Sequence, residues 1–254
     1  MHGESTPDRH LLAIAGPDRV AFLQGLVTNE ITASSQGLIY AALLSPQGKY
    51  LADFFLAPQP DVILLDVHSA LADALTRRLT MYRLRAKVTL GTSPLHIQRG
   101  LGPMPPGAHP DPRHPSLGWR LYGPHPGHAP KIDWNAIRVA ACIPETTAEL
   151  IPDDTYILEA GFERLHGVDF RKGCYVGQEV TARMKHKTEL RKGLATVRIA
   201  GSAPPGTTIT ANGKPVGTLH TQSGDQAIAY LRFDRADAPM QAASAEIYWN
   251  GAEN

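Results

Sequence analysis

The sequence predicts an α+β fold that ends in a small β-barrel, and three observations support this prediction. Strand-like and helix-like segments alternate over the first 90 residues. A break at residues 201–206 is followed by short apolar runs separated by turn signals such as Asn212-Gly213, which is typical of a small barrel or sandwich. The length of 254 residues allows one large domain or two to three small ones.

The N-terminal part combines a hairpin with flanking strands and helices. Residues 46–49 read Pro-Gln-Gly-Lys between two apolar runs and predict a β-hairpin. Pro17 suits the first turn of a helix that runs to Leu26, and apolar residues recur at helical spacing over 70–79. The predicted strands are 11–15, 38–45, 50–57, 62–67 and 87–90. Because a hairpin interrupts the alternation, we expect an α+β domain and not a doubly wound sheet.

A segment rich in proline and histidine, residues 100–130, follows these elements. Proline lacks a backbone N–H, so this segment is predicted to contain neither a helix nor a central strand. Its four histidines are conceivable metal ligands, but nothing in the sequence fixes their geometry; they are His109, His114, His125 and His128. We therefore expect an irregular solvated loop.

The composition excludes several classes of protein. A net charge of +1 argues against a general nucleic-acid-binding surface. The two cysteines, Cys142 and Cys174, cannot form a disulfide framework or hold a metal centre alone, so we expect no permanently bound metal. The motifs GxGxxG, GxxxxGK[ST], GxSxG and HExxH do not occur. The N-terminal apolar run is too short for a signal peptide and no stretch is long enough to span a membrane, so we expect a cytoplasmic protein.

The most informative segment is RKGCYVGQEVTAR, which begins at Arg171. Glycines flank Cys174 closely and permit a tight backbone on both sides of it. The residues after it favour a helix whose positive end would lie near the thiol, and Arg171 and Lys172 stand beside it. Such surroundings lower the pKa of a thiol, so we interpret Cys174 as a candidate functional thiolate with Lys172 as its activator. The alternative is a small buried cysteine in a glycine turn.

This segment also carries a resemblance to a known family. Residues 172–179, KGCYVGQE, match the K-G-C-[aromatic]-x-G-Q-E signature of the YgfZ family of folate-binding proteins. That family is related to the glycine-cleavage T protein and to mitochondrial factors that help to mature iron–sulfur proteins. Residues 22–29, 44–49 and 81–88 resemble other blocks of the family in the family's order. A further block, 137–144, resembles the stretch ahead of the signature, with a cysteine where glycine is more usual.

The resemblance implies a T-protein-like fold in three parts. A discontinuous folate-binding core would combine residues 1–45 with residues 137–192. A ferredoxin-like α+β insert, including the loop rich in proline and histidine, would fill residues 46–136. A small β-barrel would occupy residues 193–254. The parts would surround a central channel in which a folate could lie.

The resemblance also implies a function. The chain would be a folate-binding accessory protein that assists iron–sulfur cluster assembly or repair, with an indirect effect on tRNA modification. Its cofactor would be tetrahydrofolate or a related reduced folate. Its partners would be iron–sulfur assembly or client proteins, with no membrane and no direct nucleic-acid binding. The alternative is a tetrahydrofolate-dependent aminomethyl or one-carbon transferase, and the cysteine motif and short length favour the accessory protein over a classical enzyme.

Seven residues are candidates for folate contact from their places in these blocks. They are Asn29, Asp53, Tyr82, Arg83, Arg138, Gln178 and Glu179. T proteins carry acidic residues after the equivalent hairpin, and Asp53 keeps half of that pattern. Structural alternatives stay open: a solvent-facing strand residue for Asp53, a turn residue for Asn29, a helix ion pair for Glu179, and cover of a strand edge for Tyr82 and Arg83.

Positive charge is concentrated around the signature. From Arg171 to Lys192 the sequence has seven lysines and arginines against two acidic residues, an excess of +5 in a chain whose net charge is +1. Such a patch suits a polyanion, such as a polyglutamylated folate tail, an acidic partner protein or RNA. A solvated helix face is the alternative.

Overall fold

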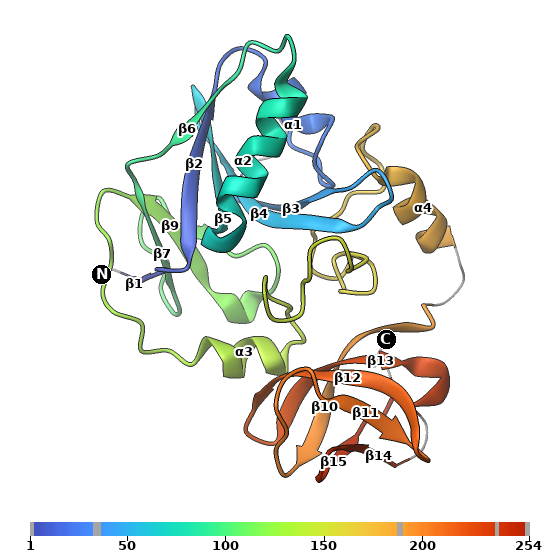
Figure 1. Ribbon diagram of the computed structural model, residues 1–254. Helices are drawn as coiled ribbons and strands as arrows, with labels where there is room; N and C mark the ends of the chain where they lie inside the picture. The colour runs from blue at the N-terminus through green and yellow to red at the C-terminus, as the bar shows by residue number, and fades with distance from the viewer. Residues whose placement is uncertain (1–2, 33–36, 187–189, 237–238, 252–254) are drawn as a thin grey trace. The chain divides into compact units, whose positions relative to one another are not determined.

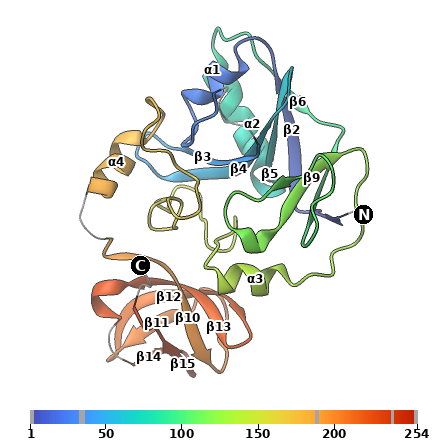
Figure 2. The same ribbon diagram turned by 180° about the vertical axis from the view of Figure 1, so that it is seen from behind.

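The computed structural model describes residues 3–32, 37–186, 190–236 and 239–251, and the chain divides into two compact units (Figures 1 and 2). Unit 1 comprises Met1–Ile132, Pro152–Asp154 and Glu163–Val180. Unit 2 comprises Asp133–Ile151, Thr155–Phe162 and Thr181–Asn254.

A five-stranded antiparallel sheet forms the centre of unit 1 (Figure 1). In spatial order its strands are β3 (Ile39–Leu44), β4 (Tyr50–Pro58), β5 (Val62–His68), β2 (Arg9–Ala15) and β6 (Thr89–Thr92). These strands and the hairpin between β3 and β4 confirm the predictions for this part of the chain. All six residues of β3 and the first eight of β4 are buried, so both faces of the sheet are covered here.

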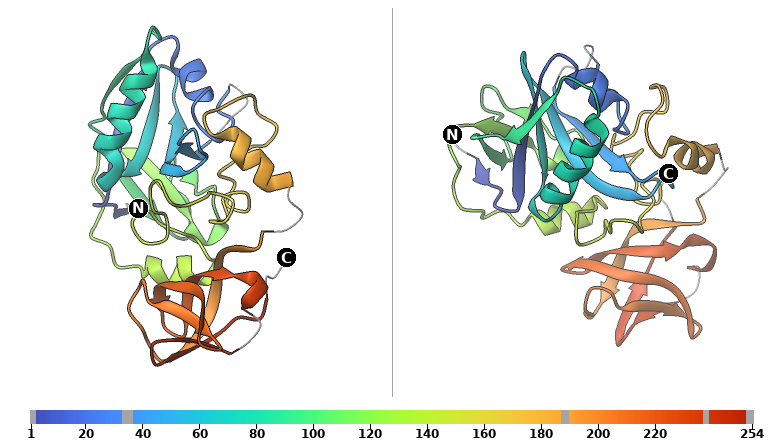
Figure 3. Two further views of the ribbon diagram at one scale, coloured as in Figure 1. Left: turned by 45° about the vertical axis from the view of Figure 1, so that its right-hand side comes forward. Right: turned by 45° about the horizontal axis from the view of Figure 1, so that its top comes forward.

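Two helices accompany this sheet, α1 (Arg19–Gln24) and α2 (Ser69–Arg83). The longer helix, α2, lies across one face of the sheet (Figure 3) and buries Ala72, Leu75 and Leu79 in the core. These residues recur at intervals of three and four, which is the spacing that places side chains on one face of a helix. Both helices were predicted, and α1 ends two residues earlier than expected.

A second sheet lies on the face of the first sheet opposite α2 (Figure 2). Its spatial order is β1 (Glu4–Ser5), β7 (His96–Gly100), β9 (Trp119–Gly123) and β8 (His109–Pro110), and a 3-10 helix spans Pro115–Leu117. Because β9 pairs on both sides, the prediction that residues 100–130 form an irregular loop without a central strand is wrong. The reason is local: residues 116–123 contain no proline, so their N–H groups are available to both neighbours.

Unit 2 contains α3 (Trp134–Ala140) and a closed six-stranded barrel. In spatial order the barrel strands are β10 (Lys192–Ala200), β13 (Gln226–Arg232), β12 (Lys214–Ser223), β11 (Thr208–Ala211), β14 (Met240–Ala242) and β15 (Ala245–Tyr248), with a 3-10 helix at Phe233–Arg235. Asn212 and Gly213 have φ angles of 49° and 72°, as a tight hairpin turn requires. The predicted C-terminal barrel is confirmed.

The structure does not divide the chain at the expected boundary after residue 45. That boundary falls inside the hairpin between β3 and β4, whose strands pair along their length. The expected core segment, residues 137–192, is likewise divided between the two units. Sheet pairing therefore joins residues 1–45 of the expected core to the expected insert.

Candidate functional site

The signature residues form an exposed loop that leads into α4 (Gln178–His186). Cys174 lies at the surface of this loop, and the side chains of Lys172 and Tyr175 beside it are buried. The N–H of Tyr175 donates to Oε1 of Gln178 at 3.2 Å, and the N–H of Gln178 donates to the carbonyl of Tyr175 at 3.3 Å. The predicted helix is present, and the thiol is exposed rather than packed in a buried turn.

Lys172 fixes this loop to the N-terminal part of unit 1. Its Nζ atom donates to the carbonyl oxygens of Gln24 at 2.8 Å, Val27 at 2.6 Å and Asn29 at 3.0 Å. An ammonium group has three N–H donors, so these carbonyls use all of them. Lys172 therefore acts as an anchor for the loop, and it has no donor left for the thiolate of Cys174 that it was predicted to activate.

The environment of the ammonium group matches this structural role. Burial lowers the pKa of Lys172 to about 8, and the carboxylates of Glu30 and Asp169 act in the opposite direction. The ammonium also lies 5.3 Å from the centre of the Tyr175 ring, close enough for a cation–π contact. The loop backbone at Cys174 is thus held by a buried cation two residues before it and by an aromatic ring immediately after it.

Two glycines bring the predicted hairpin turn and the signature loop together. Gly177 has a φ of +82°, and a Cβ there would lie 2.5 Å from the carbonyl oxygen of Ser45. Gly48, in the hairpin, has a φ of +73°, and a Cβ there would lie 2.8 Å from the Cβ of Val180. Both positions require a conformation that L side chains rarely adopt and space that no side chain can share. The two family blocks therefore meet backbone to backbone.

A polar surface pocket of about 400 Å³ lies beside the loop. It is lined by Asn29, Glu163, His166, Val168, Asp169, Phe170 and Arg171. Nδ2 of Asn29 donates to the carbonyls of Tyr40 at 2.9 Å and His166 at 2.7 Å, while its Oδ1 accepts from the N–H of Glu30. Asn29 therefore holds the pocket wall in place through backbone contacts, and Arg171 contributes an exposed cation.

Asp53 is not a solvent-facing strand residue. It is 3% exposed and accepts hydrogen bonds from the hydroxyl of Tyr50 at 2.7 Å and that of Tyr40 at 3.1 Å. Burial, followed by the charge of Asp53, raises the pKa of Tyr40 well above its usual value. A solvent-facing residue was the structural alternative for Asp53, and it is wrong because the second sheet covers this face of β4. Asp53 is therefore a buried structural partner.

The other predicted folate contacts are not among the residues that line this pocket. Tyr82 is half-buried against the core of unit 1, and Arg83 is exposed at the end of α2. Glu179 is exposed on α4, while Gln178 caps the turn at Tyr175. Arg138 belongs to unit 2, where its guanidinium contacts Glu149, Thr221 and Asn135. Of the seven candidates, Asn29 lines this pocket, and the assignment of the seven residues to a folate stays a prediction.

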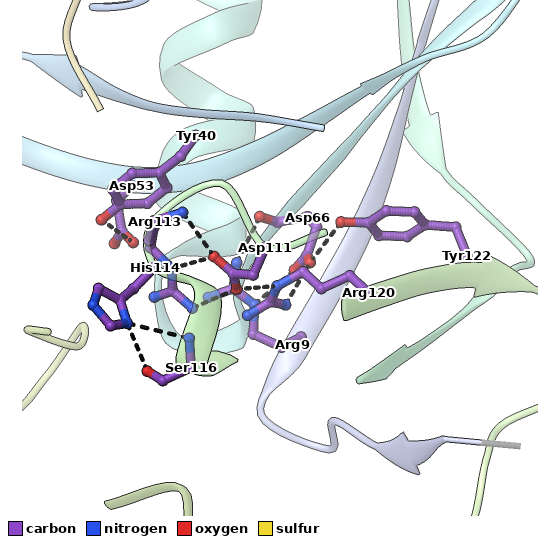
Figure 4. A network of polar contacts seen from close by, with 10 residues as sticks. All are labelled: Arg9, Tyr40, Asp53, Asp66, Asp111, Arg113, His114, Ser116, Arg120 and Tyr122. Carbon is purple, nitrogen blue, oxygen red and sulfur yellow. Dashed lines mark hydrogen bonds and ion pairs between the residues drawn. The ribbon is translucent and has the colours of Figure 1, made fainter. Parts of the chain in front are cut away.

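Sequence reasoning missed a buried network of charges between the two sheets of unit 1 (Figure 4). Asp66 on β5 accepts from Arg9 at 2.6 Å and from Arg120 at 3.0 Å. Asp111 accepts from Arg120 at 3.1 Å and from Arg113 at 2.9 Å. The signal was present in the sequence, because Asp66 interrupts the otherwise apolar strand VILLDVH. A buried carboxylate in such a strand requires a partner.

The arginines of this network also pack on an aromatic ring. The guanidinium carbon of Arg120 lies 3.9 Å from the centre of the Phe55 ring, and that of Arg113 lies 4.8 Å from it. The hydroxyl of Tyr122 donates to Asp66 at 3.1 Å. The network thus joins β4, β5 and β9 and explains why the segment rich in proline and histidine is ordered.

No group of three or more His, Cys, Asp or Glu side chains in the described ranges could hold a metal ion. No described helix is long and apolar enough to cross a membrane.

Comparison with curated proteins identifies close relatives. The chain is 33% identical to the mitochondrial iron–sulfur cluster assembly factor IBA57 of Mus musculus over 94% of this chain and 79% of the relative. It is 31% identical to the Homo sapiens protein of the same name, with the same coverage. Residues 191–252 also match the C-terminal β-barrel domain of the CAF17 family. This match covers the barrel found in unit 2.

Comparison with solved structures confirms the predicted T-protein-like fold. The glycine cleavage system aminomethyltransferase T from Bartonella henselae has a TM-score of 0.77 to this chain. The alignment covers 99% of this chain and 86% of that one at 12% sequence identity. At this identity the likeness concerns the fold alone.

The comparisons correct one prediction. We expected a cytoplasmic protein from the absence of a targeting signal, and the matching relatives are named as mitochondrial proteins. The expectation of a cytoplasmic protein is therefore contradicted. The length of an apolar run bears only on a secretory signal peptide. Transit peptides for mitochondria are amphipathic, so a short apolar run does not exclude them.

Proposed function

Because the chain belongs to the family of iron–sulfur cluster assembly factors that includes IBA57 and the YgfZ proteins, we propose that it assists cluster assembly or repair on other proteins through Cys174. The observation that supports this proposal is the exposed thiol on an anchored loop. Lys172 and Gly177 fix the backbone on either side, and Cys174 itself points to no partner within the described residues. Such a loop presents a soft sulfur ligand at a defined position without burying it.

The number of cysteines limits what this site can do alone. A two-iron or four-iron cluster is usually held by about four cysteine ligands. Cys142 lies in unit 2 beside α3, so Cys174 is the only cysteine of unit 1. The chain can therefore supply one ligand to a cluster in transit, and the remaining ligands must come from the protein that delivers or receives it. In this proposal the cluster is cargo and not a resident cofactor.

Tetrahydrofolate binding stays a proposal that rests on the family resemblance. Of the seven residues assigned to it, Asn29 lines the pocket beside the signature loop, and we derive no step that uses a folate. The pocket beside Asn29 offers space for a ligand, and its lining carries one exposed cation, Arg171, together with the carboxylates of Glu163 and Asp169. Calorimetric titration with tetrahydrofolate, and the same titration of Arg171→Ala, tests this part. An effect on tRNA modification would follow only through cluster-dependent modifying enzymes.

Complementation of a deletion strain tests the proposed function. We expect the activities of four-iron cluster enzymes to fall when the gene is deleted and to return when the wild-type chain is expressed. Transfer of methylamine from a lipoyl protein to tetrahydrofolate tests the alternative transferase, for which we expect no turnover. Unchanged cluster-enzyme activity in the deletion strain would refute the proposal.

A further inference from the structure

The end of α2 and the turn that follows it expose apolar side chains. Met81 is 70% exposed and Leu84 is 89% exposed, the highest value among the large hydrophobic residues described as exposed. Tyr82, between them, packs against the core of unit 1 and fixes the helix end in place. A single exposed leucine is ordinary, but two neighbouring apolar side chains at the tip of a fixed element need a further explanation.

Leu84 also adopts a strained backbone conformation. The N–H of Ala86 donates to the carbonyl of Arg83 at 2.8 Å, which closes a turn with Leu84 at its second position. Leu84 has φ 44° and ψ −106°, a combination that belongs to glycine at this position of a type II′ turn. The turn is held from outside, because the N–H of Lys87 donates to Oδ2 of Asp18 at 2.7 Å. The fold thus holds a leucine side chain in solvent where glycine would be relaxed.

Cations surround these apolar side chains. Residues 74–92 contain five cations and no acidic residue; the cations are Arg77, Arg78, Arg83, Arg85 and Lys87. Within the described part of the chain, none of their side chains makes an ion pair or a hydrogen bond. An excess of +5 here, in a chain of net charge +1, leaves the rest of the molecule net negative. We call Met81, Leu84 and these five cations the basic tip.

We propose that the basic tip is a docking surface for an acidic protein, whose carboxylates pair with the cations and whose apolar surface receives Met81 and Leu84. Charge complementarity supports this partner, and four of the five cations are arginines, which form bidentate pairs with carboxylates and are enriched with methionine at protein interfaces. An RNA partner would need exposed aromatic rings for stacking, and Tyr82 is packed on the core. A lipid surface would need a longer apolar face than two side chains provide.

Binding of a defined peptide tests the basic tip. The probe is a fluorescent helical peptide with a leucine stripe flanked by glutamates, and its twin carries lysine in place of each glutamate. We expect the wild-type chain to bind the acidic peptide and not the basic one, with affinity falling as salt is raised. The double variant Arg83→Glu with Arg85→Glu should weaken binding about tenfold or more, as expected for central interface residues. Leu84→Gly should weaken binding as well while raising the thermal midpoint, because glycine relieves the strain.

Matched controls separate this proposal from the function of the cysteine. Met104 is 53% exposed in residues 101–108, which carry no charge, so Met104→Ser should bind the acidic peptide like the wild type. Cys174→Ser should also bind it normally. Equal binding of both peptides, no binding of the acidic peptide, or full binding by Leu84→Gly would overturn the proposal. Binding to phosphatidylserine vesicles or to an RNA oligonucleotide would also overturn it, if that binding is stronger than binding to the acidic peptide and the same variants abolish it.

Discussion

The Nζ atom of Lys172 lies 2.6 Å from the carbonyl oxygen of Val27, a residue 145 positions earlier in the chain. Lys172 also contacts the carbonyls of Gln24 and Asn29. These contacts fasten the signature loop to the end of α1 and to the residues that directly follow it. The lysine of the signature therefore positions the cysteine two residues later, although it does not donate to it. Its contribution is to the geometry of the loop.

Replacing this lysine should loosen the loop. Lys172→Met keeps most of the side-chain volume but leaves three buried carbonyls without their donor, so we expect a loss of about 2 kcal/mol in the free energy of unfolding. Urea denaturation of the two proteins measures this loss. Lys214→Met, at an exposed strand residue, is the control and should change stability by less than about 0.5 kcal/mol. Equal stabilities of Lys172→Met and the wild type would show that the anchor is unimportant.

The contact between the two family blocks gives a second prediction. Gly177→Ala places a Cβ 2.5 Å from the Ser45 carbonyl at a φ of +82°, so we expect a loss of about 2 kcal/mol or more. Gly173→Ala is the matched control, since a Cβ there meets nothing within 4 Å and the residue lies next to Cys174. Thermal unfolding should separate the two variants clearly. A similar midpoint for both would contradict the close approach of Gly177 to the Ser45 carbonyl.

Cys142 lies at a backbone position that favours glycine. It follows α3 with a φ of +49°; its N–H bonds to the carbonyl of Val139, and the N–H of Ile143 bonds to that of Arg138, which together form a Schellman motif. Cys142→Gly should therefore stabilise the chain by about 1 kcal/mol, measured by denaturant unfolding. Ala140→Gly, at the exposed last residue of α3 and two residues earlier, should destabilise it by about the same amount. If Cys142→Gly is less stable than the wild type, the packing of the thiol contributes more to stability than the strained backbone costs.

The buried charges of unit 1 predict sensitivity to acid. Burial alone would raise the pKa of Asp111, but Arg113 and Arg120 outweigh it and lower the pKa to about 2. A carboxyl whose pKa is lowered on folding stabilises the fold above its unfolded value near 4, and this stability is lost as the pH falls from about 4 to about 2. The loss should reach about 2 kcal/mol for this group.

Substitution of this carboxyl tests the assignment. Asp111→Asn should be less stable at neutral pH, because two buried guanidinium groups lose a partner, and it should lose less stability than the wild type between pH 4 and pH 2. Asp61→Asn, at an exposed turn residue, should follow the wild type at every pH. Parallel pH profiles for Asp111→Asn and the wild type would contradict the role of Asp111.

The sequence was informative wherever local rules decide the structure. The apolar runs of β2 to β5, the helical spacing in α2 and the Asn212-Gly213 turn each predicted the right element, because burial and turn geometry set these patterns. The signature around Cys174 pointed to the right family, since glycines and a lysine at fixed spacing are specific. Non-local pairing was not visible in the same way. The central position of β9, the burial of Asp53 and the three carbonyls around Lys172 depend on segments that meet only in the folded chain.

Complementation by Cys174→Ser tests the central claim most directly. Serine nearly preserves the volume but cannot act as a soft metal ligand, so the variant should keep the wild-type melting midpoint and fail to restore four-iron cluster enzymes in a deletion strain. Cys142→Ser, in unit 2, should restore them as the wild type does. Full restoration by folded Cys174→Ser would contradict the claim that this exposed thiol handles the cluster.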